Sequence, residues 1–297
     1  MEEVQRNLRI VGSGAVGSLL ALVINQNTAN VFFSDFRENN NSTKKIYLKG
    51  VLENNFNNPT VFGFINSDIT IENDAIFICL KYSKDYLSSL NLVLKKFSAT
   101  TPVLLLQNSY RHAQTLRESF ENPFVVGMLS DLEVFFKDGA LELSSTPFTL
   151  KIADCDQDTT DLFRNALNSP IVKLAVGGSE KYIIWQKLAR WIPLSCITTI
   201  TKMSIGKALE SYPRALLFDL INEICLFAES ESFHHFDKEA IFDQLNSLPK
   251  NLTTSSMRDR IIGKHPEIQV VMSEIHQDLI KTKLPNIAIL KTLELMT

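Results

Sequence analysis

A glycine turn close to the start of the chain constrains its fold more than any other segment. The motif reads Gly12-Ser13-Gly14-Ala15-Val16-Gly17. An apolar run from Leu8 precedes it and another apolar run, to Ile24, follows it, which predicts a strand, a tight turn and a helix. Gly12 permits the turn, Gly14 lets the backbone approach a pyrophosphate, and Gly17 lets the helix pack on the strand. We therefore assign these six residues to a dinucleotide site at a helix N-terminus.

Composition excludes several classes of partner. The 297 residues suffice for two domains, and the net charge of -3 leaves no basic surplus for binding nucleic acid. The longest apolar run, Ala15 to Ile24, is far too short to span a bilayer, and no signal peptide precedes the first strand. We therefore expect a cytoplasmic protein that binds neither membrane nor nucleic acid.

Cysteine and histidine spacing predicts neither disulfides nor a metal site. The four cysteines are far apart in the chain and have no C-x-x-C spacing. The five histidines include the pair His234-His235 but no H-E-x-x-H pattern. Buried thiols in a reducing compartment are the expectation.

The segment after the first helix carries the candidate residues for cofactor choice. Residues 30–34 (NVFFS) are expected to form the second strand of a βαβ unit, followed by Asp35 and Arg37. An acid at this place binds the ribose 2′-hydroxyl, whereas an arginine just beyond it holds a 2′-phosphate. A short strand is expected from Ile46 to Leu52.

Two continuous apolar runs, Ala75 to Leu80 and Pro102 to Leu106, predict strands buried on both faces of a parallel sheet. Helices are expected from Tyr82 to about Phe97 and from about His112. Ligands of doubly wound folds collect beyond the carboxyl ends of strands, which places Lys81 and Asn108 on the same rim as the glycine turn.

The rest of the chain divides at Gly177-Gly178. Strands are expected at Val125 to Phe136, Ala140 to Ser144, Phe148 to Ile152 and Ile171 to Val176, with a helix at Asp158 to Leu167. Beyond the glycines, helical periodicity dominates. One helix is expected from Ser179, and Pro193 must end or kink it. Further helices are expected at Pro213 to Ser230, Lys238 to Leu245, Pro266 to Lys283 and in the last ten residues.

The predicted fold class is α/β, with an N-terminal Rossmann-type doubly wound sheet and a C-terminal all-α domain. The expected domains are residues 1–177, for the dinucleotide, and 178–297, for substrate and catalysis. In such a two-domain dehydrogenase architecture the active site is expected in the cleft between the domains.

Lys187 is the main catalytic candidate of the helical half. It lies in Trp185-Gln186-Lys187-Leu188, and the residues one and two helical turns later are Trp191 and Ser195. An aromatic ring and a small hydroxyl are unusual on a solvated helix face, although a helical lysine often only extends along the surface.

Several further segments, taken together, resemble one enzyme family. They are Gly12 to Gly17, Cys79-Leu80-Lys81, Leu104-Leu105-Leu106-Gln107-Asn108, Trp185 to Leu188, the segment around Gly206, Ser255-Ser256-Met257-Arg258-Asp259 and Pro266-Glu267-Ile268. The chain resembles the ketopantoate reductases (2-dehydropantoate 2-reductases) over essentially its whole length. That family uses NADPH to reduce the keto group of ketopantoate, giving pantoate for pantothenate and coenzyme A synthesis.

The resemblance implies a role for each matching residue. Lys187 corresponds to the catalytic lysine and Glu267 to the active-site glutamate. The implied cofactor residues outside the glycine turn are Arg37, which selects the 2′-phosphate, Lys81, which lines the cofactor cleft, and Asn108, which lies near the nicotinamide. The implied substrate residues are Asn108, Lys187 and Ser256, and Ser195, two turns after Lys187, is a further substrate candidate of this chain.

The substrate half departs from the family pattern. The family usually has asparagines one and two turns after the catalytic lysine, where this chain has Trp191 and Ser195. The stretch after the glutamate, residues 269–273, lacks the usual Asp, Asn and Gly, and the spacing from Ser256 to Glu267 is one residue shorter than usual. Arg190 and Arg258 add two cations near the pocket in sequence, as surface charges or as partners of a substrate carboxylate.

Two alternatives to ketopantoate reduction follow. One is a related reductase for a different, bulkier 2-keto acid, in which Trp191 fills part of the pocket. The other is an NADP(H)-binding sensor without turnover. The expected partner is in each case a small molecule, and the chain is expected to be a monomer or a homodimer.

Overall fold

The structure, a computed structural model, describes residues 6–26, 30–34, 43–46, 48–50, 60–64, 74–83, 86–144 and 146–296. The chain divides into two compact units. The first contains Met1–Lys81 and Asp85–Ile183, and the second contains Tyr82–Lys84 and Ile184–Thr297. Each unit is described by itself below.

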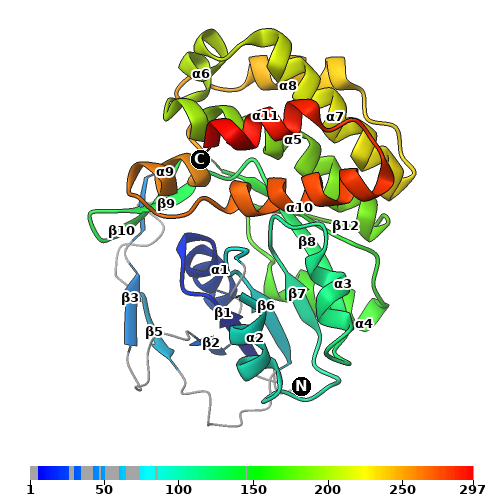
Figure 1. Ribbon diagram of the computed structural model, residues 1–297. Coiled ribbons are helices and arrows are strands. Elements are labelled where there is room, and N and C mark those ends of the chain that lie inside the picture. The colour runs from blue at the N-terminus through cyan, green and yellow to red at the C-terminus, as the bar shows by residue number, and fades with distance from the viewer. Residues whose placement is uncertain are drawn as a thin grey trace. The chain divides into compact units, whose positions relative to one another are not determined.

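The first unit is built on a nine-stranded sheet in the order β12-β11-β8-β7-β6-β1-β2-β5-β3 (Figure 1). Its strands are β1 (Asn7–Val11), β2 (Asn30–Ser34), β3 (Thr43–Ile46), β5 (Thr60–Phe64), β6 (Ala75–Ile78), β7 (Val103–Leu105), β8 (Phe124–Ser130), β11 (Phe148–Ile152) and β12 (Val172–Val176). The six strands from β5 to β8 in this order pair in parallel, and β11 and β3 pair antiparallel to β8 and β5. This is the predicted Rossmann-type sheet.

The strand order reverses at β1, because β2 lies on one side of it and β6 on the other. In doubly wound folds the crevice at this switch point binds the ligand. The chain just beyond β1 is fixed on both sides: the N–H of Gly12 donates to the Ser34 carbonyl at 3.1 Å, and the N–H of Cys79 donates to the Val11 carbonyl at 2.9 Å. The fold thereby holds the glycine turn and the loop after β6 side by side.

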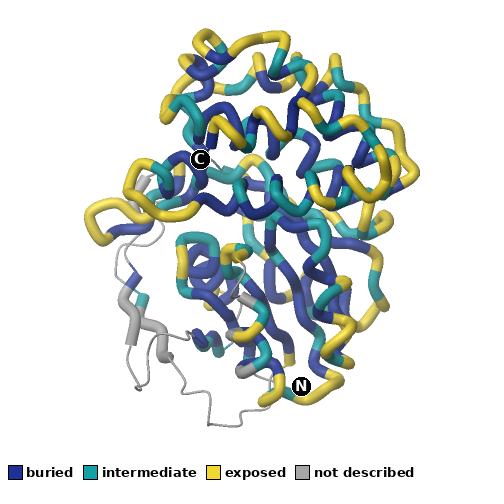
Figure 2. The backbone as a smooth tube through the Cα atoms, viewed as in Figure 1, coloured by how far each residue is buried: buried dark blue, intermediate teal, exposed yellow. Residues whose placement is uncertain are grey.

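Among the described residues, the first unit also contains helices and a small second sheet. The helices are α1 (Ala15–Asn25), α2 (Tyr86–Leu94), α3 (His112–Arg117) and α4 (Gln157–Ala166), and the small sheet has the order β4 (Leu48–Gly50), β10 (Ala140–Leu143), β9 (Val134–Lys137). Eight consecutive residues of α1, 17–24, are buried, since this helix contacts β1, β2, β9 and β10. Figure 2 shows the buried strands β6 and β7, which have no exposed face and therefore read as unbroken apolar runs.

The second unit is helical. Its helices are α5 (Glu180–Thr201), α6 (Ile205–Ser211), α7 (Arg214–Ser232), α8 (Lys238–Ser247), α9 (Ser255–Ile261), α10 (Glu267–Thr282) and α11 (Ile287–Met296). The first four residues of α5 precede the unit boundary. Trp185 of α5 packs edge-to-face on Phe227 of α7, with ring centroids 5.3 Å apart. Among the described residues, no helix has the length and apolarity needed to cross a membrane.

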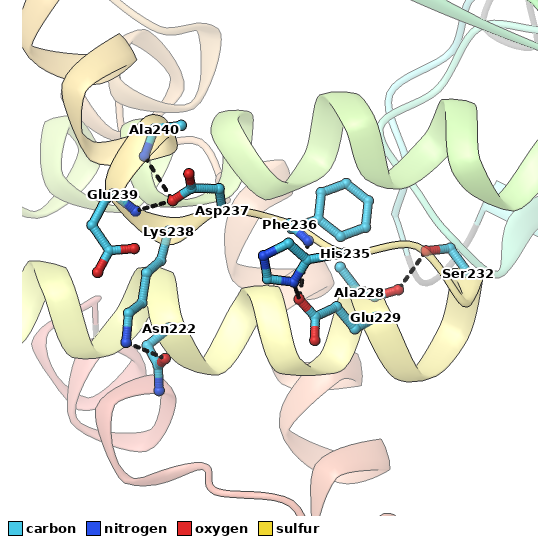
Figure 3. Close-up of polar contacts among 10 residues, drawn as sticks. All are labelled: Asn222, Ala228, Glu229, Ser232, His235, Phe236, Asp237, Lys238, Glu239 and Ala240. Atoms are coloured by element: carbon cyan, nitrogen blue, oxygen red, sulfur yellow. Dashed lines mark hydrogen bonds and ion pairs between the residues drawn. The ribbon is translucent and has the colours of Figure 1, made fainter.

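Buried and exposed carboxylates fix the ends of these helices. Glu223 of α7, which is buried, accepts from the main-chain N–H groups of Ala288 and Ile289 at the start of α11. At the turn between α7 and α8, Glu229 accepts from the N–H of Phe236 and from His235 Nδ1 (Figure 3). Asp237 accepts from two N–H groups in the first turn of α8, and those hydrogen bonds lower the pKa of its carboxyl group.

Several predicted boundaries are wrong. Val125 to Phe136 is two strands, because Asp131 adopts a left-handed conformation with φ of 58° between β8 and β9. Tyr82 does not start a helix, since α2 begins at Tyr86. Of the two effects expected of Pro193, an end or a kink of its helix, the end does not occur: α5 continues to Thr201, with Ile192, Ser195 and Cys196 buried around the proline. Two seven-residue helices, α6 and α9, were not expected from the sequence.

Candidate active site

The three glycines of the turn differ in how much space the surrounding protein leaves for a Cβ atom. Gly12 has φ of +103°, and a Cβ there would lie 2.9 Å from the Leu80 side chain. A Cβ on Gly17 would overlap the carbonyl oxygen of Gly12, so this position requires glycine for the fold itself. Gly14 is exposed, and a Cβ there would have nothing within 4 Å. The protein's own packing therefore does not require glycine at position 14.

The turn leads directly into the start of α1, which no side chain caps. Gly14 is the N-cap residue, and the Ser18 hydroxyl donates to the carbonyl of Ser13 at 3.1 Å. The first N–H groups of an α-helix have no partner within the helix. Ala15 and Val16 are half-buried and supply such groups at the positive end of the helix dipole. An open backbone at Gly14 beside uncapped N–H groups fits a dinucleotide pyrophosphate.

The rim beside this turn is formed by the loops after β6 and β7. Lys81 is exposed and Asn108 is half-buried. The residue that fixes this rim is Gln107, which is buried and donates from Nε2 to the carbonyl of Leu80 at 2.8 Å. Arg37 and Asp35 lie outside the described residues, so the structure does not bear on the predicted cofactor choice.

Lys187 lies in the middle of α5, within the second unit, and its side chain is half-buried. Desolvation lowers the pKa of this lysine to about 8. The charge of Glu267 opposes that shift, and the charge of Arg190 on the same helix adds to it. An amine with this pKa exchanges its proton near neutral pH, as a general acid requires.

Glu267 is the first residue of α10 and is only 5% exposed. Its Oε1 accepts from the main-chain N–H of Tyr82 at 2.9 Å. The Tyr82 hydroxyl donates to Glu274 Oε1, seven residues further along α10, at 2.6 Å. Tyr82 therefore binds two carboxylates on the same face of α10: Glu267 through its main-chain N–H and Glu274 through its hydroxyl group.

Three buried hydroxyls of the second unit have no hydrogen-bond partner in the described part of the chain: Ser195, Thr199 and Ser256. Ser195 and Ser256 are fully buried. The helices that carry them meet nearby, because the Thr198 hydroxyl contacts the hydroxyl of Thr254, the N-cap residue of α9, at 2.8 Å. Buried hydroxyls in proteins are nearly always hydrogen-bonded, so each of these three has unused capacity for a hydrogen bond to a water molecule or to a polar ligand.

The other candidates of this unit are placed less specifically. Trp191 is half-buried, one turn after Lys187. The Arg190 guanidinium donates to the Gln186 carbonyl of its own helix at 3.3 Å, and Arg258 donates to the Thr253 hydroxyl at 2.7 Å. The second unit thus contains Lys187, Ser195, Ser256 and Glu267, and the first contains the glycine turn, Lys81 and Asn108.

The cysteines and acids form no second site in the part of the chain that the structure describes. Cys79, Cys155, Cys196 and Cys225 are unpaired thiols, and no group of His, Cys, Asp and Glu is arranged to hold a metal ion. Burial raises the pKa of Cys225 to about 12, which keeps this thiol protonated and unreactive.

Sequence reasoning missed Tyr82 and Gln107. Gln107 directly follows a buried strand, so its position could have marked it as strongly as that of Asn108. Tyr82 had been assigned to a helix, and no pattern in the sequence relates it to residues 185 positions later.

The glycine turn and strands of the first unit also match a known family. Residues 8–157, which are just over half of the chain, match the sequence profile of the family described as "Ketopantoate reductase PanE/ApbA". The chain belongs to this family. Members of the ketopantoate reductase family are oxidoreductases, and the resemblance proposed from the sequence is thereby confirmed. No curated protein sequence matches the chain.

Solved structures share the fold over nearly the whole chain. A dimeric ketopantoate reductase from Staphylococcus aureus is 18% identical, with a TM-score of 0.80 over 98% of this chain and 97% of that one. A PanE/ApbA family ketopantoate reductase from Ralstonia eutropha JMP134 is 18% identical, with a TM-score of 0.79 over 98% and 97%. A D-mandelate dehydrogenase, solved with NADH and anilino(oxo)acetate, is 16% identical, with a TM-score of 0.80 over 98% and 97%.

Proposed function

We propose that this protein reduces a 2-keto acid with NADPH, and that ketopantoate is the substrate, giving pantoate. The observation that carries the proposal is the state of Lys187: a half-buried amine whose pKa desolvation lowers to about 8, on the same unit as buried, unpaired hydroxyls. Membership of the ketopantoate reductase family supports the reaction class. Residues 178–297 are the proposed catalytic region.

Each residue of the proposed site acts on a different part of the reaction. When bound, the reduced nicotinamide supplies the hydride that the keto carbon accepts. The Lys187 ammonium stabilises the negative charge that develops on the keto oxygen and donates a proton to it. Glu267 favours the protonated form of Lys187 through its charge. The Ser195 and Ser256 hydroxyls hydrogen-bond polar groups of the substrate, and Asn108 positions it.

The first unit would hold the dinucleotide through the glycine turn. The N–H groups at the start of α1 bind the pyrophosphate, and Gly14 leaves it room. Lys81 and Asn108 line the proposed cofactor side of the site, and Arg37 binds the 2′-phosphate. The cytoplasm is the proposed location, and a monomer or a homodimer is the proposed assembly; the similar S. aureus enzyme is described as dimeric.

Arg37→Ala is expected to raise the Kd for NADPH while leaving the Kd for NADH nearly unchanged, because only NADPH carries the 2′-phosphate. Loss of one bidentate charge pair corresponds to roughly 10- to 100-fold in affinity. Fluorescence titration of both dinucleotides measures this change. Equal or better kcat/KM with NADH in the unaltered protein would instead assign the pocket to Asp35.

Trp191 supports a second candidate, a 2-keto acid with a bulkier or aromatic substituent. This ring stands where the family usually has an asparagine, one turn after Lys187, and it is partly exposed. The similar D-mandelate dehydrogenase was solved with anilino(oxo)acetate, an N-phenyl oxamate in which an amide carbonyl next to the carboxylate takes the place of the carbonyl of an aryl 2-keto acid. An indole contacts an apolar substituent better than it contacts a hydroxyl group.

A panel of 2-keto acids tests the proposal. Ketopantoate, straight-chain and branched 2-keto acids and phenylglyoxylate are each assayed by the loss of NADPH absorbance. Highest kcat/KM for ketopantoate supports the first candidate, whereas highest kcat/KM for phenylglyoxylate supports the second. Tight NADPH binding with no reduction of any of them would instead favour a dinucleotide sensor.

A further inference from the structure

Tyr82–Lys84 belong to the helical unit, although the chain before and after these three residues belongs to the dinucleotide unit. Tyr82 follows Lys81 at the end of the loop after β6 and lies four residues before α2. Tyr82 itself lies in neither a helix nor a strand, and two hydrogen bonds attach it to α10.

The two bonds of Tyr82 act on one helix face. Glu267 and Glu274 are seven residues apart on α10, so they project from nearly the same side, two turns apart. The bond to Glu274 is an O–H···O bond of 2.6 Å to a carboxylate, which is the short, charge-assisted kind. This bond fixes the tyrosine side chain, and the main chain at residue 82 then presents its N–H to Glu267.

The bound carboxylate is the one that acts on Lys187. Two charged groups shift the pKa of Lys187 besides desolvation: Glu267 of α10, which raises it, and Arg190 of α5, which lowers it. The influence of Glu267 depends on the distance between carboxylate and ammonium. A residue that holds the carboxylate in place therefore contributes to the protonation of the lysine, whose pKa is shifted most by desolvation.

We propose that Tyr82 is a positioning residue, which holds the Glu267 carboxylate at Lys187 through its main-chain N–H and is itself held by Glu274. The inference rests on the proposed function, in which Lys187 is the proton donor. It adds to that function a residue outside the family's matching motifs. Tyr82 also directly follows Lys81, the proposed cofactor residue, so the cofactor loop continues into the segment that holds the acid.

The first test is Tyr82→Phe, which keeps the ring and the main-chain N–H but removes the bond to Glu274. We expect the pKa of Lys187 to fall, because a less restrained Glu267 stabilises the ammonium less. We also expect kcat to fall about 10-fold, the rate equivalent of one hydrogen bond to a charged group, with KM for NADPH nearly unchanged. The pKa is measured without turnover, from the pH dependence of Lys187 modification by an amine-reactive reagent, followed by mass spectrometry.

Glu274→Gln and Glu274→Ala test the same contact from the other side. Glutamine keeps an oxygen that accepts from the tyrosine hydroxyl, so it should retain more of the Lys187 pKa and of kcat than alanine does. Tyr82→Phe combined with Glu274→Ala should have no larger effect than either alone, since both remove one bond.

Tyr212→Phe is the matched control. It removes a buried tyrosine hydroxyl of the same unit, which contacts the Thr292 hydroxyl at 3.4 Å, and it should leave the Lys187 pKa unchanged. An unchanged Lys187 pKa in Tyr82→Phe would overturn the proposal. Failure of the unaltered protein to reduce any keto acid would overturn the proposed function instead, and the modification experiment would still decide the role of Tyr82.

Discussion

Lys187→Met is expected to lower kcat by about 1,000-fold, within the range of a lost general acid. Methionine fills a similar volume and has no proton to donate, so the half-buried position stays packed. The Kd for NADPH should change little, because the proposed dinucleotide residues belong to the other unit. Single-turnover NADPH oxidation measures the chemical step, and fluorescence titration measures binding.

The pH dependence of the unaltered enzyme is a second test of the role of Lys187 as proton donor. The Lys187 pKa is about 8, and only the protonated amine donates, so kcat/KM for reduction should fall as the pH rises through that value. This fall should be missing in the residual activity of Lys187→Met. Lys181→Met, at an exposed position of the same helix, is the control and should keep both rate and pH profile. Equal kcat in Lys187→Met and the unaltered protein would remove this lysine from the mechanism.

Gly14→Ala is expected to weaken dinucleotide binding without weakening the fold. Its φ of -66° suits alanine, and the added Cβ meets nothing of the protein within 4 Å. The close approach of a pyrophosphate is what requires glycine here. Overpacking such a contact costs about 1–3 kcal/mol, which corresponds to a roughly 5- to 150-fold rise in Kd.

Gly17→Ala is the contrasting variant of the same turn. A Cβ there overlaps the Gly12 carbonyl, so strand and helix must separate even without a ligand. We expect this change to cost about 3 kcal/mol of the free energy of unfolding, seen as a fall of roughly 6–12 °C in Tm. An NADPH affinity in Gly14→Ala equal to that of the unaltered protein would argue against a pyrophosphate at this turn.

The strands of the sheet could be predicted because each strand is marked by the hydrophobic pattern of its own few residues. β2 occupies the predicted residues 30–34, and β6 and β7 lie inside the predicted runs, since strands buried on both faces are continuously apolar. Helices with an apolar stripe, such as α7 and α10, were found to within two residues at each end. The short helices α6 and α9 were missed because seven residues are too few to establish a period.

Where the sequence failed, tertiary contacts override a local rule. Pro193 removes one helical N–H, and of the two predicted outcomes, an end or a kink, the end does not occur, because α5 continues through buried neighbours of the proline. Tyr82 has neighbours that suit a helix, yet its N–H and hydroxyl bind Glu267 and Glu274 instead. These hydrogen bonds join residues nearly 200 positions apart in the chain, and the hydrophobic periodicity of the sequence cannot predict them.

The amino-acid sequence alone determined the glycine turn, the two kinds of unit and the family, because spacing and periodicity act over a few residues. The tertiary structure decided how far desolvation lowers the pKa of Lys187, which buried hydroxyls lack partners, and which residue holds Glu267. Those properties depend on the atoms that surround a side chain, and these come from parts of the chain that only folding brings together.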